Sequence, residues 1–135
     1  MQVIRIVVKT EPVAKGRPRT TLHFGRVWTF TPQKTKTAQE FLKARLLKHT
    51  KDSFPPHTSV KLTAVFYRTK SKYLPRKELM PFRKPDLDNF LKLLLDAING
   101  ILVEDDAQIT SISAKKRWTT KNYGYITIKL CPDKG

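Results

Sequence analysis

The sequence predicts an α+β fold, a single domain in which a small mixed β-sheet carries two main helices packed on one face. The chain has 135 residues, a length typical of one domain with one hydrophobic core. Short runs rich in β-branched side chains alternate with two longer stretches whose apolar residues recur at helical spacing. No internal repeat or low-complexity segment interrupts this pattern, so we expect residues 1–135 to form one unit.

The first half of the chain predicts strands and one long helix. Residues 3–8 are rich in β-branched side chains, and residues 20–30 alternate weakly around a glycine, which indicates a strand and then a short hairpin. Thr31 is a typical N-cap before a proline, so a helix should span residues 32–49. Residues 60–67 place apolar side chains on one face at period two, and we expect this strand to be central.

The second half predicts a helix followed by two strands. The helix should begin at residue 86 or 87, after a proline, and end at Asn99-Gly100, a common left-handed stop signal. Its expected core stripe consists of Leu87, Leu91, Leu94, Leu95 and Ile98. Residues 101–103 read as a short buried segment. Residues 108–118 and 123–130 then predict a closing antiparallel hairpin.

The charge of the chain indicates a polyanionic partner. There are 27 Lys and Arg against 11 Asp and Glu, a formal net charge of +16. No apolar run approaches the roughly 20 residues of a membrane-spanning helix, so we expect no membrane partner. Cys131 is the one cysteine, and the N-terminus does not resemble a cleaved signal, which favours a cytoplasmic protein. The three histidines are scattered and lack zinc-site spacing, so oxygen atoms should hold any metal ion.

Acidic residues are concentrated in one stretch of this basic chain. Six of the 11 fall between residues 83 and 108, namely Asp86, Asp88, Asp96, Glu104, Asp105 and Asp106. Such crowding is costly unless a cation lies among the carboxylates. Magnesium prefers oxygen ligands and usually keeps contacts with water and substrate phosphates. We therefore expect a divalent metal ion that bridges the protein and a phosphate.

The spacing of these acids allows two carboxylate clusters to meet. A helix of about four turns followed by a returning strand would bring Asp106 back toward the level of Asp88. The competing interpretation is that Asp86 and Asp88 cap the free amides of a helix start and complement its dipole. Lys92 lies one turn beyond Asp88, where its ammonium would either pair with that aspartate or stabilise charge on the phosphate.

Two basic segments predict contacts with nucleic acid. The first is a loop that contains Lys15, Arg17 and Arg19, whose guanidinium groups suit phosphates. The second runs from residue 68 to 84, where cations are interleaved with the aromatic side chains of Tyr73 and Phe82. Its basic residues are Lys70, Lys72, Arg76, Lys77, Arg83 and Lys84. The alternative for both segments is a solvated surface loop.

The acidic stretch also resembles a known family. The run Lys-Pro-Asp-Leu-Asp-Asn-Phe-Leu-Lys at residues 84–92, with Asp96-Ala97 and Glu-Asp-Asp-Ala-Gln at 104–108, looks like the signature of the RusA family of Holliday junction endonucleases, common in bacteria and prophages. Residues 12–19 and 30–35 also resemble many members. The resemblance implies a homodimer that binds four-way DNA junctions and nicks two strands symmetrically in recombination and repair, with magnesium or manganese as cofactor.

The resemblance also implies roles for individual residues. By matching position, Asp86, Asp88 and Asp106 would be the essential carboxylates, Lys92 the accompanying lysine and Asp105 an adjacent candidate metal ligand.

Three functions remain open at this point. The leading one is a metal-dependent, structure-selective endodeoxyribonuclease that resolves Holliday junctions and needs no nucleotide cofactor. The second is a non-catalytic basic DNA-binding protein, in which the acids only cap a helix and balance lysines. The third is a metal nuclease that acts on flaps or RNA, because the phosphodiester chemistry is shared and substrate geometry depends on the dimer.

Overall fold

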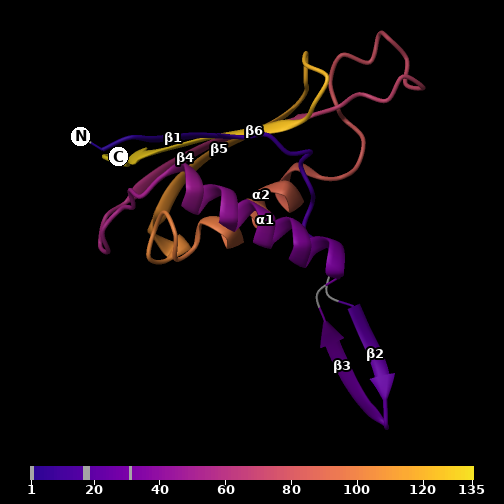
Figure 1. Ribbon diagram of the computed structural model, residues 1–135, viewed down its shortest axis with the longest axis horizontal. Helices are drawn as coiled ribbons and strands as arrows, with labels where there is room; N and C mark the ends of the chain where they lie inside the picture. The colour runs from indigo at the N-terminus through magenta and orange to yellow at the C-terminus, as the bar shows by residue number, and fades with distance from the viewer. Residues whose placement is uncertain (1, 17–18, 31) are drawn as a thin grey trace.

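A computed structural model describes residues 2–16, 19–30 and 32–135 and has the predicted α+β architecture. Its main sheet has four strands in the order β1, β6, β4, β5. These strands are β1 (Ile4–Val8), β4 (Val60–Arg68), β5 (Ile109–Trp118) and β6 (Tyr125–Pro132). The helices α1 (Gln33–His49) and α2 (Leu87–Ile98) both lie on one face of this sheet (Figure 1). The prediction that residues 60–67 form a central strand is confirmed, since β4 is an interior strand.

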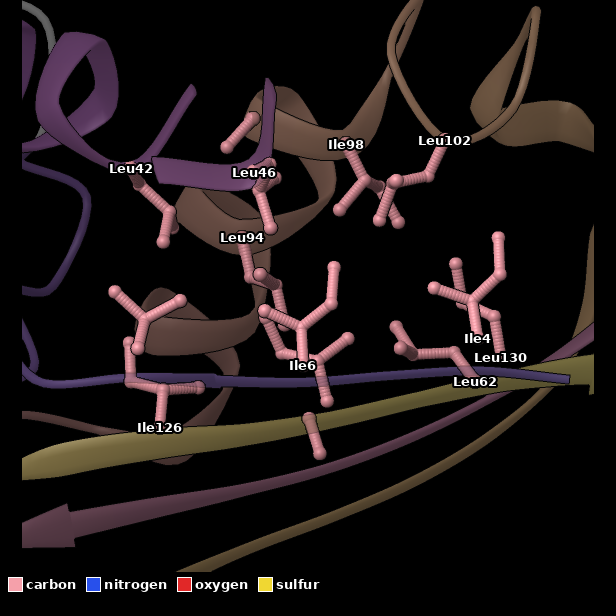
Figure 2. Packing of buried hydrophobic residues seen from close by; sticks show 14 of the residues in the cluster. Ile4, Ile6, Leu42, Leu46, Leu62, Leu94, Ile98, Leu102, Ile126 and Leu130 are labelled. Carbon is pink, nitrogen blue, oxygen red and sulfur yellow. The ribbon is translucent and has the colours of Figure 1, made fainter. Parts of the chain in front are cut away.

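The core lies between this sheet and the two helices (Figure 2). Alternate residues of each strand point into it because side chains along a strand change face at every residue. The buried residues include Ile4 and Ile6 of β1, Leu62 of β4, Leu46 of α1 and Leu94 of α2.

The core stripe of α2 is rotated from the predicted one. Leu94 and Ile98 are buried as expected, but Leu87, Leu91 and Leu95 are only partly buried. The deepest positions of the helix also include Phe90, Leu93 and Ala97. Phe90 stacks on Phe66 of β4 with ring centroids 5.5 Å apart, and this aromatic pair fixes the helix face that meets the sheet.

The closing antiparallel hairpin predicted for the last two strands is wrong. β5 pairs in parallel with β4, while β6 pairs antiparallel with β4 on its other side. The order β4, α2, β5 is therefore a crossover unit that returns the chain in its original direction. β6 then runs back between β1 and β4, so that β4 separates it from β5.

A second, two-stranded sheet lies outside this body. It consists of β2 (Arg19–His23) and β3 (Arg26–Phe30), which form the predicted hairpin and project away from the main sheet (Figure 1). The turn places Phe24 and Gly25 at φ values of 50° and 72°. The predicted N-cap Thr31 lies outside the described residues, and α1 begins at Gln33 with Pro32 as its capping position.

The segments around α2 are irregular. Residues 69–86 contain neither a helix nor a strand, in agreement with the predicted loop. After α2 the chain turns at Gly100, where φ is 79°, and a single bridge pairs Asn99 with Val103. A one-turn 3-10 helix, η1 (Asp106–Gln108), leads into β5. Within the described ranges, no helix is both long and apolar enough to cross a membrane.

Candidate active site

Two aspartates and a lysine lie at the start of α2. Asp86 is the N-cap residue, and within the described structure its side chain makes no capping hydrogen bond. Asp88 lies in the first turn, where its Oδ2 is 3.5 Å from Lys92 Nζ. The side chains of Asp88 and Lys92 are 65% and 58% exposed. Of the two alternatives for Lys92, the pairing with Asp88 is therefore present, and it lies at the surface, where a phosphate can reach both residues.

Three further aspartates lie near the other end of α2. Asp96 accepts a hydrogen bond of 2.7 Å from Lys15 Nζ, and each side chain is about one third exposed. The backbone N–H of Asp106 donates to the side-chain oxygen of Asn99 at 3.1 Å, which holds Asp106 beside the helix end. Burial, a hydrogen bond with Asp105 and the charges of Asp105 and Asp96 raise the pKa of Asp106.

Asp105 shapes the turn that carries Asp106. Its Oδ1 accepts a hydrogen bond of 3.0 Å from the backbone N–H of Ala107, and Gln108 completes a capping box. The Gln108 amide also donates to the carbonyl oxygens of Pro55 and Thr58, at 2.8 and 3.1 Å. This network fixes the position of Asp106 against the loop that precedes β4.

The chain does not return along α2 as expected. The segment after the helix is a turn with one isolated bridge, so Asp106 lies beside Asn99 and Asp96 rather than at the level of Asp88. Asp88 and Asp96 are eight residues apart on one helix, which corresponds to about 12 Å along its axis. Asp96 was outside the set of predicted site residues. Its position two helical turns from Asp88, on the same edge, was the signal that could have included it.

The carboxylates supply the oxygen ligands that a hard cation prefers, but they lie in two separate groups. Oxygen donors of this kind suit magnesium and manganese. Within the described part of the chain, however, no three Asp, Glu, His or Cys side chains come close enough together to hold a metal ion. Asp86 and Asp88 lie at the start of α2, whereas Asp96, Asp105 and Asp106 lie near its end.

Lys116 is a basic residue near the site that the sequence analysis missed. Its Nζ donates hydrogen bonds of 2.8 Å to the carbonyl oxygens of Arg83 and Pro85. Burial and the charge of Arg68 lower the pKa of Lys116, and the charge of Asp86 partly offsets this effect. Lys116 thus ties the loop before α2 to β5. No local signal identifies it, because it lies 30 residues beyond Asp86 in the chain.

The first predicted DNA-binding loop is tied to α2. The backbone N–H of Lys15 donates to the carbonyl of Asn89 at 2.9 Å, while its side chain pairs with Asp96. Lys15 is therefore occupied by contacts within the protein. Arg17 lies outside the described residues, and Arg19 begins β2 with a side chain that the structure does not describe.

The second basic loop has internal and exposed cations. Lys70 Nζ donates to the carbonyl of Glu78 at 2.7 Å, and Arg83 forms an ion pair of 2.9 Å with the buried Glu78 carboxylate. The remaining predicted cations are exposed, namely Lys72, Arg76, Lys77 and Lys84. Tyr73 and Phe82 are 87% and 72% exposed, so their rings lie at the surface rather than in the core.

Comparisons with known proteins cover most of the chain. A family model described as endodeoxyribonuclease RusA matches residues 9–130. The chain is also 30% identical, over 125 residues, to the uncharacterized protein YqaN of Bacillus subtilis (strain 168). That alignment spans 86% of this chain and 88% of YqaN.

Proposed function

The chain belongs to the RusA family of endodeoxyribonucleases, and from this we propose which of its residues cleave DNA. The chain is a Holliday junction endodeoxyribonuclease, and enzymes of its family require a divalent metal ion. The observation that carries the account is the placement of acidic side chains along α2 in a protein whose formal net charge is +16. The cations attract the DNA, and the carboxylates mark the position of the chemistry.

We assign catalysis to four residues. Asp86, Asp88 and Asp106 are the proposed essential carboxylates, and Lys92 is the accompanying lysine. The exposure of the Asp88 and Lys92 pair supports this assignment, as do the burial and the neighbouring carboxylates that raise the pKa of Asp106. The proposed metal-binding residues fall into two groups in this chain, Asp86 and Asp88 at the start of α2 and Asp105 and Asp106 near its end, with Asp96 as a charged neighbour of Asp106.

The proposed reaction is hydrolysis of one phosphodiester bond in each of two strands. When bound, magnesium or manganese stabilises negative charge on the phosphate and lowers the pKa of water. The water oxygen bonds to phosphorus, the bond from phosphorus to one sugar oxygen breaks, a carboxylate accepts the proton from water, and the released sugar oxygen takes up a proton from solvent. Lys92, which pairs with Asp88 before DNA binds, turns toward the phosphate and offsets its developing charge.

The remaining proposals concern the setting of the reaction. We propose that the enzyme acts as a homodimer in the cytoplasm, in DNA recombination and repair, without a nucleotide cofactor. Exposed cations of the 69–86 loop and the arginines of the first basic loop would contact phosphates. Lys15, Lys70 and Arg83 would instead keep these loops in position, because their side chains already bind acceptors within the protein.

One side-by-side cleavage assay tests this account. A four-way junction, a flap, a linear duplex and an RNA hairpin with matched sequences are incubated with magnesium, and then with excess chelator. We expect paired nicks in the junction that disappear with chelator, and little cleavage of the other three. Preferred cleavage of the flap or the RNA would contradict the proposed substrate. Tight junction binding without cleavage under any metal condition would indicate a non-catalytic DNA-binding protein.

A further inference from the structure

The main sheet has a second face, turned away from both helices (Figure 1). We call this surface the open face. It is formed by the strand residues that alternate with those of the core, and strand pairing places them in rows. The residues of this face that matter for binding are Arg5 of β1, Lys61 and Tyr67 of β4, Lys115 of β5, and Tyr125 and Lys129 of β6.

Positive charge is concentrated on the open face. Arg5 is the direct cross-strand partner of Lys129, and Lys115 is the partner of Val65 at the other edge. Directly opposite residues of an antiparallel pair have Cβ atoms only about 5 Å apart, so Arg5 and Lys129 repel each other unless an anion lies near them. The side chains of Arg5, Lys61, Lys115 and Lys129 are all exposed.

No acidic residue balances these cations within the sheet. The four strands contain neither Asp nor Glu. Two carboxylates, Asp133 and Glu11, lie near the ends of the open face. Hydrogen bonds from the Thr110 hydroxyl and the Gly135 backbone N–H lower the pKa of Asp133, and the charge of Lys61 adds to this effect. Glu11 accepts hydrogen bonds from Thr69. Within the described residues, no ion pair involves Arg5, Lys61, Lys115 or Lys129.

One end of the open face carries a group of tyrosines. Tyr67 and Tyr125 stack with ring centroids 4.3 Å apart, and Tyr123 lies 6.0 Å from Tyr125. Lys9 Nζ lies 4.1 Å from the Tyr123 ring centre, and Lys121 Nζ lies 5.6 Å from both the Tyr123 and the Tyr125 ring centres. These contacts hold two more ammonium groups beside the open face.

The middle of the open face is hollowed. A shallow depression of about 340 Å³ lies between β1, β6 and β4, lined among others by Arg5, Thr63, Thr127 and Lys129. Hydroxyl groups and long cationic side chains are the groups that proteins use to contact the sugar–phosphate backbone.

We infer that the open face is a second DNA-contacting surface, which binds the phosphate backbone of a duplex arm on the side of the sheet opposite α2. This inference rests on the proposed function in that it takes DNA as the polyanion. A second copy of the chain is the less favourable occupant, because a two-fold interface over this face would bring the cations of one copy near those of the other. DNA phosphates complement its cations.

Salt dependence of junction binding tests the inference. The double variant Arg5→Gln, Lys129→Gln is compared with Lys48→Gln, Lys51→Gln, which removes two charges from exposed positions near the end of α1. Binding to a labelled four-way junction is measured by fluorescence anisotropy in calcium over a series of NaCl concentrations. We expect the slope of log affinity against log salt to fall by about two units in the open-face variant and little in the control.

Three further measurements distinguish DNA binding by the open face from self-association and from misfolding. The charge-preserving double variant Arg5→Lys, Lys129→Arg should keep the wild-type slope, and circular dichroism melting checks that each variant is folded. An open-face variant that keeps the wild-type slope overturns the inference. So does one that loses only self-association in sedimentation, since the open face would then be an interface between copies. If the wild-type protein fails to cleave junctions and the open-face variant still shows a reduced slope, the inference is supported and the proposed function is contradicted.

Discussion

At the scale of single residues, the aspartates in and next to α2 differ in what surrounds them. Asp88 is largely exposed and has Lys92 as its partner, whereas Asp96 is held by Lys15 at 2.7 Å. Asp106 lies beside Asp105 and Asp96, and burial together with these two carboxylates raises its pKa. A residue that serves catalysis must be able to exchange its protein partner for substrate or metal. Asp88 and Asp106 meet this requirement better than Asp96.

The first prediction concerns the charges of these two aspartates. Asp88→Asn and Asp106→Asn keep side-chain size and remove the carboxylate, so junction cleavage should fall by about 100-fold or more. Junction affinity should stay the same or increase, because repulsion between carboxylate and phosphate is removed. Single-turnover cleavage and anisotropy measure the two quantities separately. Parallel loss of binding and cleavage in a folded variant would assign these residues a structural role.

A second prediction links Asp106 to stability. Because its folded-state pKa is raised, the ionised carboxylate opposes folding, and this penalty disappears as pH falls through the raised pKa. Asp106→Asn should therefore raise the melting temperature at pH 7 by about 1–3 °C. The difference from the wild type should shrink toward pH 4. Asp52→Asn, in the exposed segment after α1, serves as the control and should show no such trend.

At the scale of elements, basic side chains hold the segments around α2. Lys15 joins the first basic loop to the helix through Asn89 and Asp96. Lys116 joins β5 to the last residues of the 69–86 loop. The position of α2 therefore depends on contacts with lysines as well as on its apolar face.

The third prediction tests the tether made by Lys116. Lys116→Met keeps an apolar stem and leaves the carbonyls of Arg83 and Pro85 without their donor, which should destabilise the protein by about 1–2 kcal/mol. Trypsin should then cut faster after Arg76 and Lys77, because the loop loses an anchor. Lys115→Met changes the adjacent residue, whose side chain lies on the open face, and should leave the trypsin rate unchanged. Equal rates for both variants would mean that Lys116 does not restrain the loop.

The spacing of apolar residues predicted most helices and strands well, because each type of element repeats these residues at its own period. The ion pair of Asp88 with Lys92 was predictable for the same reason, since residues four apart on a helix are neighbours. Strand pairing was not, because β5 meets β4 through a crossover that spans α2. The position of Asp106 was missed because the segment after Gly100 forms a turn instead of a strand.

At the scale of the whole molecule, the acidic groups and the open face lie on opposite sides of one thin sheet. The side of α2 carries the proposed catalytic acids, and the open face carries exposed cations. A four-way junction has several duplex arms that leave its centre in different directions. A small protein with basic surfaces on two sides can contact more than one arm.

The last prediction concerns the number of chains that act together. A junction is resolved productively when two strands related by a two-fold axis are both cut. One chain of 135 residues carries one set of acids along α2, so a monomer would have to release the junction and bind it again between cuts. A symmetric homodimer places two identical sites at a fixed separation. The second cut should then follow the first before the DNA dissociates.

A supercoiled plasmid with an extruded cruciform distinguishes these cases, because relaxation after a single nick removes the cruciform. A dimer should give mainly linear plasmid, since both cuts occur within one bound complex. A mixture of wild-type and Asp88→Asn chains should shift the product toward nicked circles in proportion to the mixed dimers formed. Sedimentation that shows a monomer at working concentration, together with mainly nicked circular product from the wild type, would contradict the dimer even if the carboxylate predictions held.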